Sequence, residues 1–130
     1  MSVNFRIEGD SRLVVEYFSG TVTVNEFLEL QAHLAADPAF DPDFDVLVDT
    51  TAVTDTNGSF AGAVQAARSN PFSLKSRCAV AASSDLAFGM ARMYGAVRKG
   101  GEFEVFRTLA EARRWLEMSH LVECPESNTA

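Results

Sequence analysis

The hydrophobic pattern changes along the chain from strict alternation to continuous apolar runs. Residues 3–8 alternate apolar and polar side chains, and after a turn at Gly9-Asp10 the segment 12–18 returns as a second strand. Residues 45–49 and 77–82 carry consecutive apolar side chains, which is typical of interior strands covered on both faces. A fifth, short strand is predicted over residues 102–107. The pattern predicts an antiparallel hairpin at one side of a sheet, with interior strands beside it.

Four segments between and after these strands have the 3.6-residue period of helices. They cover residues 24–36, 58–69, 86–97 and 109–116. The first begins at a capping box formed by Thr23 and Glu26, and its apolar stripe is interrupted only by Gln31. The second is rich in Ala and Gly, and the third is apolar on more than one side. Because exposed apolar residues favour association, we expect a homodimer with one of these two helices near its interface.

The order of elements is β-β-α-β-α-β-α-β-α, and successive β-α-β units imply parallel neighbours with right-handed crossovers. The fold class is therefore α/β, with a mixed, mostly parallel five-stranded sheet flanked by four helices. Residues 1–118 are predicted to form a single domain, and residues 119–130 a disordered tail.

Charge and cysteine content limit the partners and the cellular location that we expect for this protein. The net charge of −7 disfavours nucleic acid and anionic membranes as partners. No apolar run reaches the ~20 residues of a membrane span, and the charged N-terminal segment does not fit a signal peptide. Cys78 and Cys124 have no metal-ligand spacing. These features predict a reduced, cytoplasmic protein.

The residues that carry common chemistries do not form a catalytic or metal-binding pattern. The glycines lack the following Lys-Ser/Thr of a phosphate-binding loop, and the two histidines, His33 and His120, fall on the outer face of a helix and in the tail. Asp41, Asp43 and Asp45 match part of a calcium loop, but Val46 replaces its glycine. We therefore expect no catalytic residues, no bound metal and no cofactor.

A polar surface is predicted where the parallel strands end. Strands ending at Asp49, Ser83 and Arg107 bring three helix N-termini to one edge of the sheet, where backbone amides are unpaired. The hydroxyl-rich segment 54–60 follows the central strand and either contacts a partner or caps the next helix. The predicted contact surface consists of Asp49, Thr54, Asp55, Thr56, Ser59 and Asp85.

Several segments resemble the SpoIIAA-like proteins, also described as STAS/SEC14-like domains, which are mostly uncharacterised bacterial proteins. The matching segments are Leu34-Ala35-Ala36-Asp37-Pro38, Phe40-Asp41-Pro42-Asp43-Phe44-Asp45, Val46-Leu47-Val48-Asp49, the stretch 87–94, Val105-Phe106-Arg107 and the stretch 111–116. The resemblance covers nearly the whole chain to about Trp115 and implies a mixed sheet flanked by helices, with no established activity in most members. An antagonist branch carries a phosphorylated Ser in an Asp-Ser-Ser-Gly-Leu element. Here that region reads Thr54-Asp55-Thr56-Asn57-Gly58-Ser59-Phe60, without the motif.

Two functions outside catalysis remain open. The first is a regulatory or protein-interaction domain that presents the segment 54–60 to another protein or to a second copy of the chain. The alternative is a small-molecule or lipid-binding domain with a pocket between the helices 58–69 and 86–97, where small side chains leave space. The predicted wall of that pocket includes Ala63, Met90 and Met93. An uncharacterised enzyme is the third choice.

Overall fold

The computed structural model describes residues 3–56, 60–98 and 100–118. Five strands and four helices follow one another in the predicted order. Their bounds are β1 Val3–Glu8, β2 Leu13–Val22, α1 Val24–Ala36, β3 Asp45–Thr56, α2 Phe60–Arg68, β4 Cys78–Ala81, α3 Asp85–Val97, β5 Phe103–Phe106 and a last helix over 109–118. The predicted α/β class, with its mostly parallel five-stranded sheet and four helices, is confirmed.

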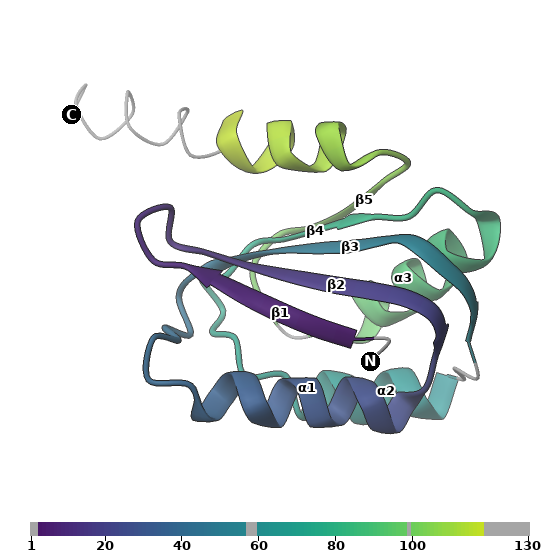
Figure 1. The fold of residues 1–130 in the computed structure, drawn as a ribbon, viewed down its shortest axis with the longest axis horizontal. Coiled ribbons are helices and arrows are strands. Elements are labelled where there is room, and N and C mark those ends of the chain that lie inside the picture. Colours follow the sequence, from purple (N-terminus) through teal and green to yellow (C-terminus); the bar gives the residue numbers. More distant parts are fainter. Residues whose placement is uncertain (1–2, 57–59, 99, 119–130) are drawn as a thin grey trace.

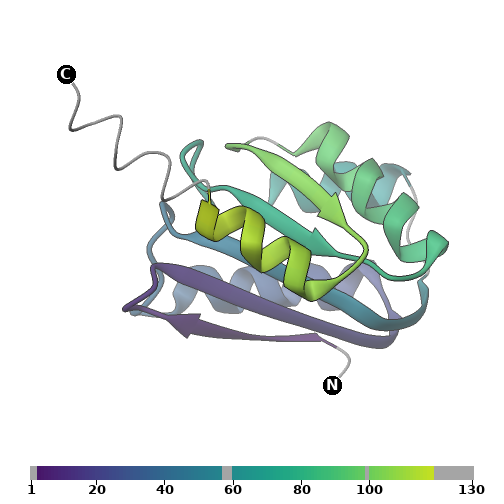
Figure 2. The ribbon, with the colours of Figure 1, turned by 90° about the horizontal axis from the view of Figure 1, so that it is seen from above.

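The sheet keeps the order of the sequence, β1-β2-β3-β4-β5. Only β1 and β2 are antiparallel, and every later pair is parallel. Because all three crossovers advance in the same direction with the same hand, α1, α2 and α3 lie on one face of the sheet. The helix over 109–118 folds back across the opposite face (Figures 1 and 2).

Alternate residues of each strand supply two separate cores. Val14, Val46 and Val80 face α1–α3 together with Leu34, whereas Leu47, Ala79 and Ala81 face the last helix. Both faces of β3 and β4 are thus covered where these strands pair, which explains their unbroken apolar runs. Ala112 and Leu116 close the second core from the last helix.

The strands β2 and β3 are longer than the sequence pattern predicts. The predicted ends, at residues 18 and 49, are wrong, because β2 continues to Val22 and β3 to Thr56. The register shifts between Tyr17 and Ser19 and between Gly20 and Thr21, so that β3 contributes two additional residues over this stretch. Bulges of this kind bend a strand pair, and Figure 1 shows β2 and β3 curving toward the side of α1 and α2. Gly20 accommodates the bend with a φ of 63°.

The helix ends follow the predicted capping chemistry. Thr23 Oγ1 accepts a hydrogen bond from the amide of Glu26 at 3.2 Å, and the Glu26 carboxylate accepts one from the amide of Thr23 at 3.1 Å. The amide of Ala87 donates to Ser84 Oγ at the start of α3. These bonds satisfy backbone amides that a helix leaves unpaired, and they fix where α1 and α3 begin.

The second apolar side of α3 is largely covered within the chain. Phe88 packs against the core between the sheet and α1–α3, and the guanidinium of Arg107 lies over its ring at 4.1 Å. Leu86 remains 45 % exposed. Because Phe88 is partly buried within the chain, it gives no support to the homodimer. The homodimer stays a prediction.

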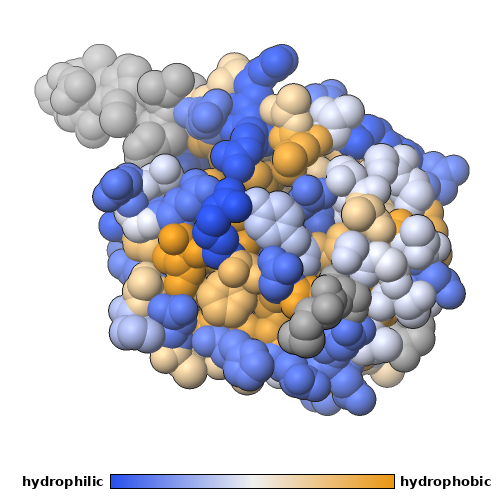
Figure 3. All heavy atoms as spheres, viewed as in Figure 1, coloured by the Kyte–Doolittle hydropathy of each residue, from blue (hydrophilic) through white to orange (hydrophobic). Residues whose placement is uncertain are grey.

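Most of the face seen in Figure 3 is hydrophilic. Hydrophobic side chains gather between β1 and α1, at the edge of the sheet where Phe5 and Ile7 are only half-buried. Among the helices of the described part of the chain, none is both long and apolar enough to cross a membrane.

Candidate functional site

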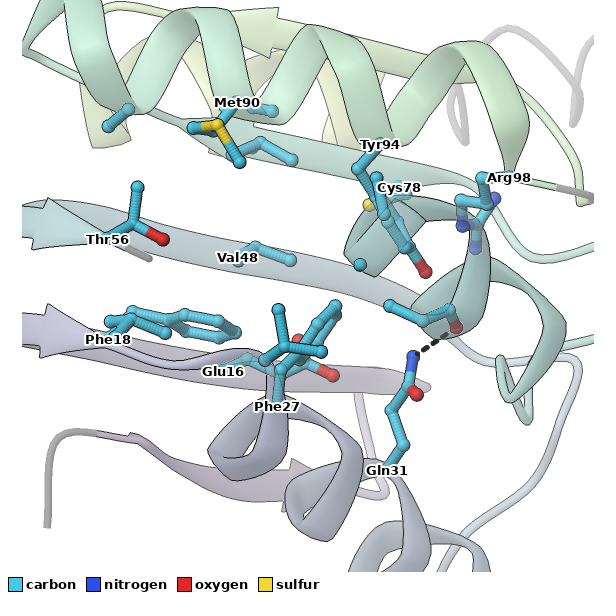
Figure 4. Close-up of a pocket in the computed structure, with 18 of the residues that line it drawn as sticks. Glu16, Phe18, Phe27, Gln31, Val48, Thr56, Cys78, Met90, Tyr94 and Arg98 are labelled. Carbon is cyan, nitrogen blue, oxygen red and sulfur yellow. Dashed lines mark hydrogen bonds between the residues drawn. The ribbon is translucent and has the colours of Figure 1, made fainter. Parts of the chain in front are cut away.

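A cavity of about 150 Å³, partly open to solvent, lies between the sheet and the three helices α1, α2 and α3. Its floor is the helix-facing side of β2, β3 and β4, and its walls come from the three helices (Figure 4). The lining is apolar over most of its extent, with Phe18, Val48, Val80 and Met90 among its side chains. A cavity of this size in a protein core accommodates a molecule about as large as benzene.

The sequence explains why this space is not filled. The helices α2 and α3 line the space with the small side chains of Ala63, Ala66, Ala87 and Ala91, which fill little of it. At one end, the bent continuation of β2 and β3 extends the floor toward the helices, and Val53 lines the cavity there. A helix carrying larger side chains at these positions would occupy the volume.

Polar groups gather at one end of the cavity. Gln31 comes from α1, and Tyr94 and Arg98 come from the carboxyl end of α3. Glu16 lies on β2 at the level of Val48, further along the floor. Figure 4 shows Gln31, Tyr94 and Arg98 at this end, opposite Phe18, Thr56 and Met90. The amide nitrogen of Gln31 donates to the carbonyl oxygen of Ala66 at 3.1 Å, whereas its Oε1 is buried without a hydrogen-bond partner.

Glu16 is a carboxyl group in an apolar setting. It is 3 % exposed and occupies a helix-facing position of β2, between Val14 and Phe18. Within the described residues, its carboxyl group has neither a hydrogen bond nor an ion pair. Burial raises the pKa of Glu16 to about 7, and the charge of Arg98 opposes this rise only partly. The group therefore changes its charge near neutral pH.

Arg98 brings a permanent positive charge to the end of the cavity where Gln31 and Tyr94 lie. It is the C-cap of α3, where its amide donates to the carbonyl of Tyr94, and a cation is favourable at a helix carboxyl end. Its Nη1 and Nη2 atoms are buried without a hydrogen-bond partner among the described residues. The guanidinium packs against Gly100, where a Cβ atom would clash with it. Two charge-bearing donors thus lie in the cavity wall unsatisfied, which is a costly arrangement in a protein interior.

The neighbouring ionisable groups stay neutral. Burial raises the pKa of the Cys78 thiol to about 12, and burial also raises the pKa of the Tyr94 hydroxyl. Cys78 is therefore a protonated thiol at neutral pH and a weak nucleophile. In the described part of the chain, no group of three or more His, Cys, Asp and Glu residues is placed to hold a metal ion. The arrangement is suited to binding a molecule with one polar end.

The residues predicted as a pocket wall lie partly on this cavity. Ala63 and Met90 line it, as does Thr56, which was predicted for the surface. Met93 is not among the lining residues. The cavity adjoins α2 and α3, and its lining also includes residues of α1 and of the sheet. That this space is a ligand pocket stays a prediction.

Asp49, Thr54, Asp55 and Asp85, which were also predicted for the surface, are not among the residues that line the cavity. Asp49 accepts hydrogen bonds from the amide and the hydroxyl of Thr51, and Asp85 forms an ion pair with Arg107 at 2.9 Å. Thr54 and Asp55 are exposed on the extended part of β3. Ser59 lies outside the described residues.

Sequence reasoning missed Glu16, Tyr94 and Arg98 as site residues. Glu16 carries a detectable signal, because it occupies a buried position in the alternation of β2. Gln31 carries a similar one as the only polar residue in the apolar stripe of α1. Arg98 carries none, since a basic residue at a helix end has a sufficient local explanation in the helix dipole.

Comparison with known proteins identifies the fold. No protein-family model matches the chain, and no curated protein matches it. A solved structure that is similar belongs to an uncharacterised protein of the DUF3478 family, with a SpoIIAA-like fold, from Shewanella loihica PV-4. The two share 18% sequence identity with a TM-score of 0.61, over 88% of this chain and 94% of the other. The resemblance to SpoIIAA-like proteins is thereby confirmed at the level of the fold.

The burial of Glu16 predicts a measurable pH dependence of stability. Its pKa is raised from 4.5 to about 7 in the folded state, so the folded protein binds a proton more tightly than the unfolded chain does. Stability is therefore lost as pH rises from about 4.5 to about 7, by roughly 3 kcal/mol. Glu16→Gln removes this loss, so its stability relative to wild type should increase by that amount across the window.

Urea unfolding followed by the fluorescence of Trp115, the single tryptophan, measures the difference at each pH. Glu104→Gln, at an exposed position of β5, is the matched control and should run parallel to wild type. Parallel curves for Glu16→Gln and wild type would show that the carboxyl group is solvated.

Proposed function

We propose that this protein binds a small, mostly apolar molecule in the cavity between the sheet and α1–α3. The observation that carries the proposal is an unfilled apolar space, with buried polar atoms of Gln31 and Arg98 at one end that have no hydrogen-bond partner in the described part of the chain. Ligand pockets in proteins typically have this composition, with a few polar groups that fix orientation. A purely structural core would favour filling the space and pairing Glu16 and Arg98.

A cavity-filling substitution tests the proposal. Ala63→Leu places a larger side chain in the cavity from α2, so it should abolish binding while stability is kept or raised. Toluene is a suitable probe because its size is close to that of the space. In a methyl NMR spectrum, toluene should shift the Met90 signal of the wild type and leave that of Met93 nearly unchanged.

The matched control is Ala61→Leu, an exposed position of the same helix. This variant should bind toluene as the wild type does. Absence of a Met90 shift in the wild type would contradict the proposal, and so would unchanged binding by Ala63→Leu.

A second candidate function, regulation through protein contact, is favoured by the extended end of β3. The strand pairs with β4 only over Val46–Asp49, while its pairing with β2 continues to Thr56. Over residues 52–55, no described strand pairs with the other edge of β3, and Thr54 and Asp55 are exposed there. An unpaired edge can receive an extended segment of a partner by strand addition.

Site-specific photocrosslinking in cells tests this second function. A photoreactive residue at Thr54 should yield a discrete crosslinked product. The same residue at Arg92, an exposed position on α3, should not. Equal products at both positions, or none at Thr54, would exclude the edge of β3 as a specific contact surface.

A further inference from the structure

The unsatisfied guanidinium of Arg98 sets the chemistry of the ligand's polar end. Both of its terminal nitrogens are buried in the cavity region and have no acceptor within hydrogen-bond distance among the described residues. The guanidinium of arginine stays charged in proteins, and the Tyr94 hydroxyl, which lies close to it, is neutral. An anion is therefore the partner that would compensate its charge. A carboxylate matches two guanidinium nitrogens with two parallel hydrogen bonds.

Glu16 does not already serve as that anion. Ion pairs among the described residues join Arg6 to Glu8, Arg77 to Asp45 and Arg107 to Asp85, and none joins Glu16 to Arg98. Glu16 is instead neutralised by burial, which leaves the polar end with a net positive charge whenever its carboxyl group is protonated. An amine would be repelled by that charge, and a neutral molecule would leave it uncompensated.

The rest of the cavity sets the body of the ligand. The apolar remainder of the 150 Å³ is lined by groups such as Phe18, Val48 and Met90. It excludes a bulky or highly charged molecule such as a nucleotide, because there is neither volume nor polar surface for one. A single aromatic ring or a short alkyl chain fits.

We propose that the ligand is a small monocarboxylic acid with an aromatic or short aliphatic body, whose carboxylate binds the guanidinium of Arg98. This inference rests on the proposed binding function and specifies its ligand class. It makes Arg98 the specificity-determining residue and Glu16 the residue that makes binding depend on pH.

The pH dependence follows from the groups that face Glu16. These are Arg98 and Tyr94 on α3 and Cys78 on β4, and the lining residues from α1 and α2 carry no ionisable group. Tyr94 and Cys78 remain neutral in the working range because burial raises the pKa of each. When Glu16 ionises above about pH 7, its charge opposes the carboxylate of the ligand. Affinity for a carboxylate should therefore fall roughly tenfold per pH unit above that point.

Three probes of matched size test the proposal by calorimetric titration at about pH 6. Benzoate should bind at least about tenfold more tightly than benzyl alcohol, as expected for charge-assisted hydrogen bonds. Benzylamine should bind more weakly than either. At about pH 8.5, benzoate should lose roughly tenfold or more in affinity, and Glu16→Gln should abolish that loss.

Substitution of the arginine isolates its contribution. Arg98→Met should remove the preference for benzoate over benzyl alcohol while binding of toluene persists, which shows that the cavity is intact. Arg92→Met, an exposed position of the same helix, is the control and should keep the preference.

The outcomes separate this inference from the proposed function. Equal affinity of wild type for benzoate and benzyl alcohol, with toluene bound, would overturn the carboxylate assignment and leave the binding function in place. A preference for benzoate that survives Arg98→Met would overturn the role of Arg98. If no probe binds, toluene included, both proposals fail.

Discussion

The structure depends on covering both faces of its two central strands. β3 and β4 are paired on each side and carry apolar side chains toward both layers, so helices must lie above and below them. The three crossover helices take one face because their connections share one hand. The last helix supplies the other face through Ala112 and Leu116. This constraint places α1, α2 and α3 side by side over a floor of short β-branched residues.

The cavity follows from how these helices meet the sheet. Alanines on α2 and α3 and valines on the strands line it, and these small side chains leave part of the space between the layers unfilled. Such a space costs stability, because its lining forgoes the dispersion contacts of a packed core. Glu16 and Arg98 add the cost of buried, unpaired polar groups. A site that retains both costs is consistent with binding, since a ligand can supply the missing contacts.

The sequence predicts the elements well because their signals are local. Alternation in β1, the apolar runs of β3 and β4, and the capping residue Thr23 each act within a few residues. The length of β3 is not predictable in this way. Its polar end, Thr50 to Thr56, becomes a strand because β2 pairs with it across two bulges, and bulges leave no clear composition signal. Local propensity for a turn is overridden by tertiary pairing.

The site is predictable only in part for the same reason. Ala63 and Met90 are recognisable as candidates because small and flexible residues on adjacent helices indicate space. Glu16, Gln31 and Arg98 lie on three elements that are far apart in the chain. No rule of sequence spacing predicts that their side chains line the same cavity. Each has an ordinary local explanation, and only the packed structure shows that all three line one cavity.

A crystal structure determined under xenon pressure tests the central claim most directly, because xenon enters apolar cavities without requiring polar contacts. The account predicts xenon between Phe18, Val48 and Met90, with Arg98 at the opposite end and not ion-paired to Glu16. A cavity filled by Phe27 or Met90, or closed by an ion pair between Glu16 and Arg98, would contradict it.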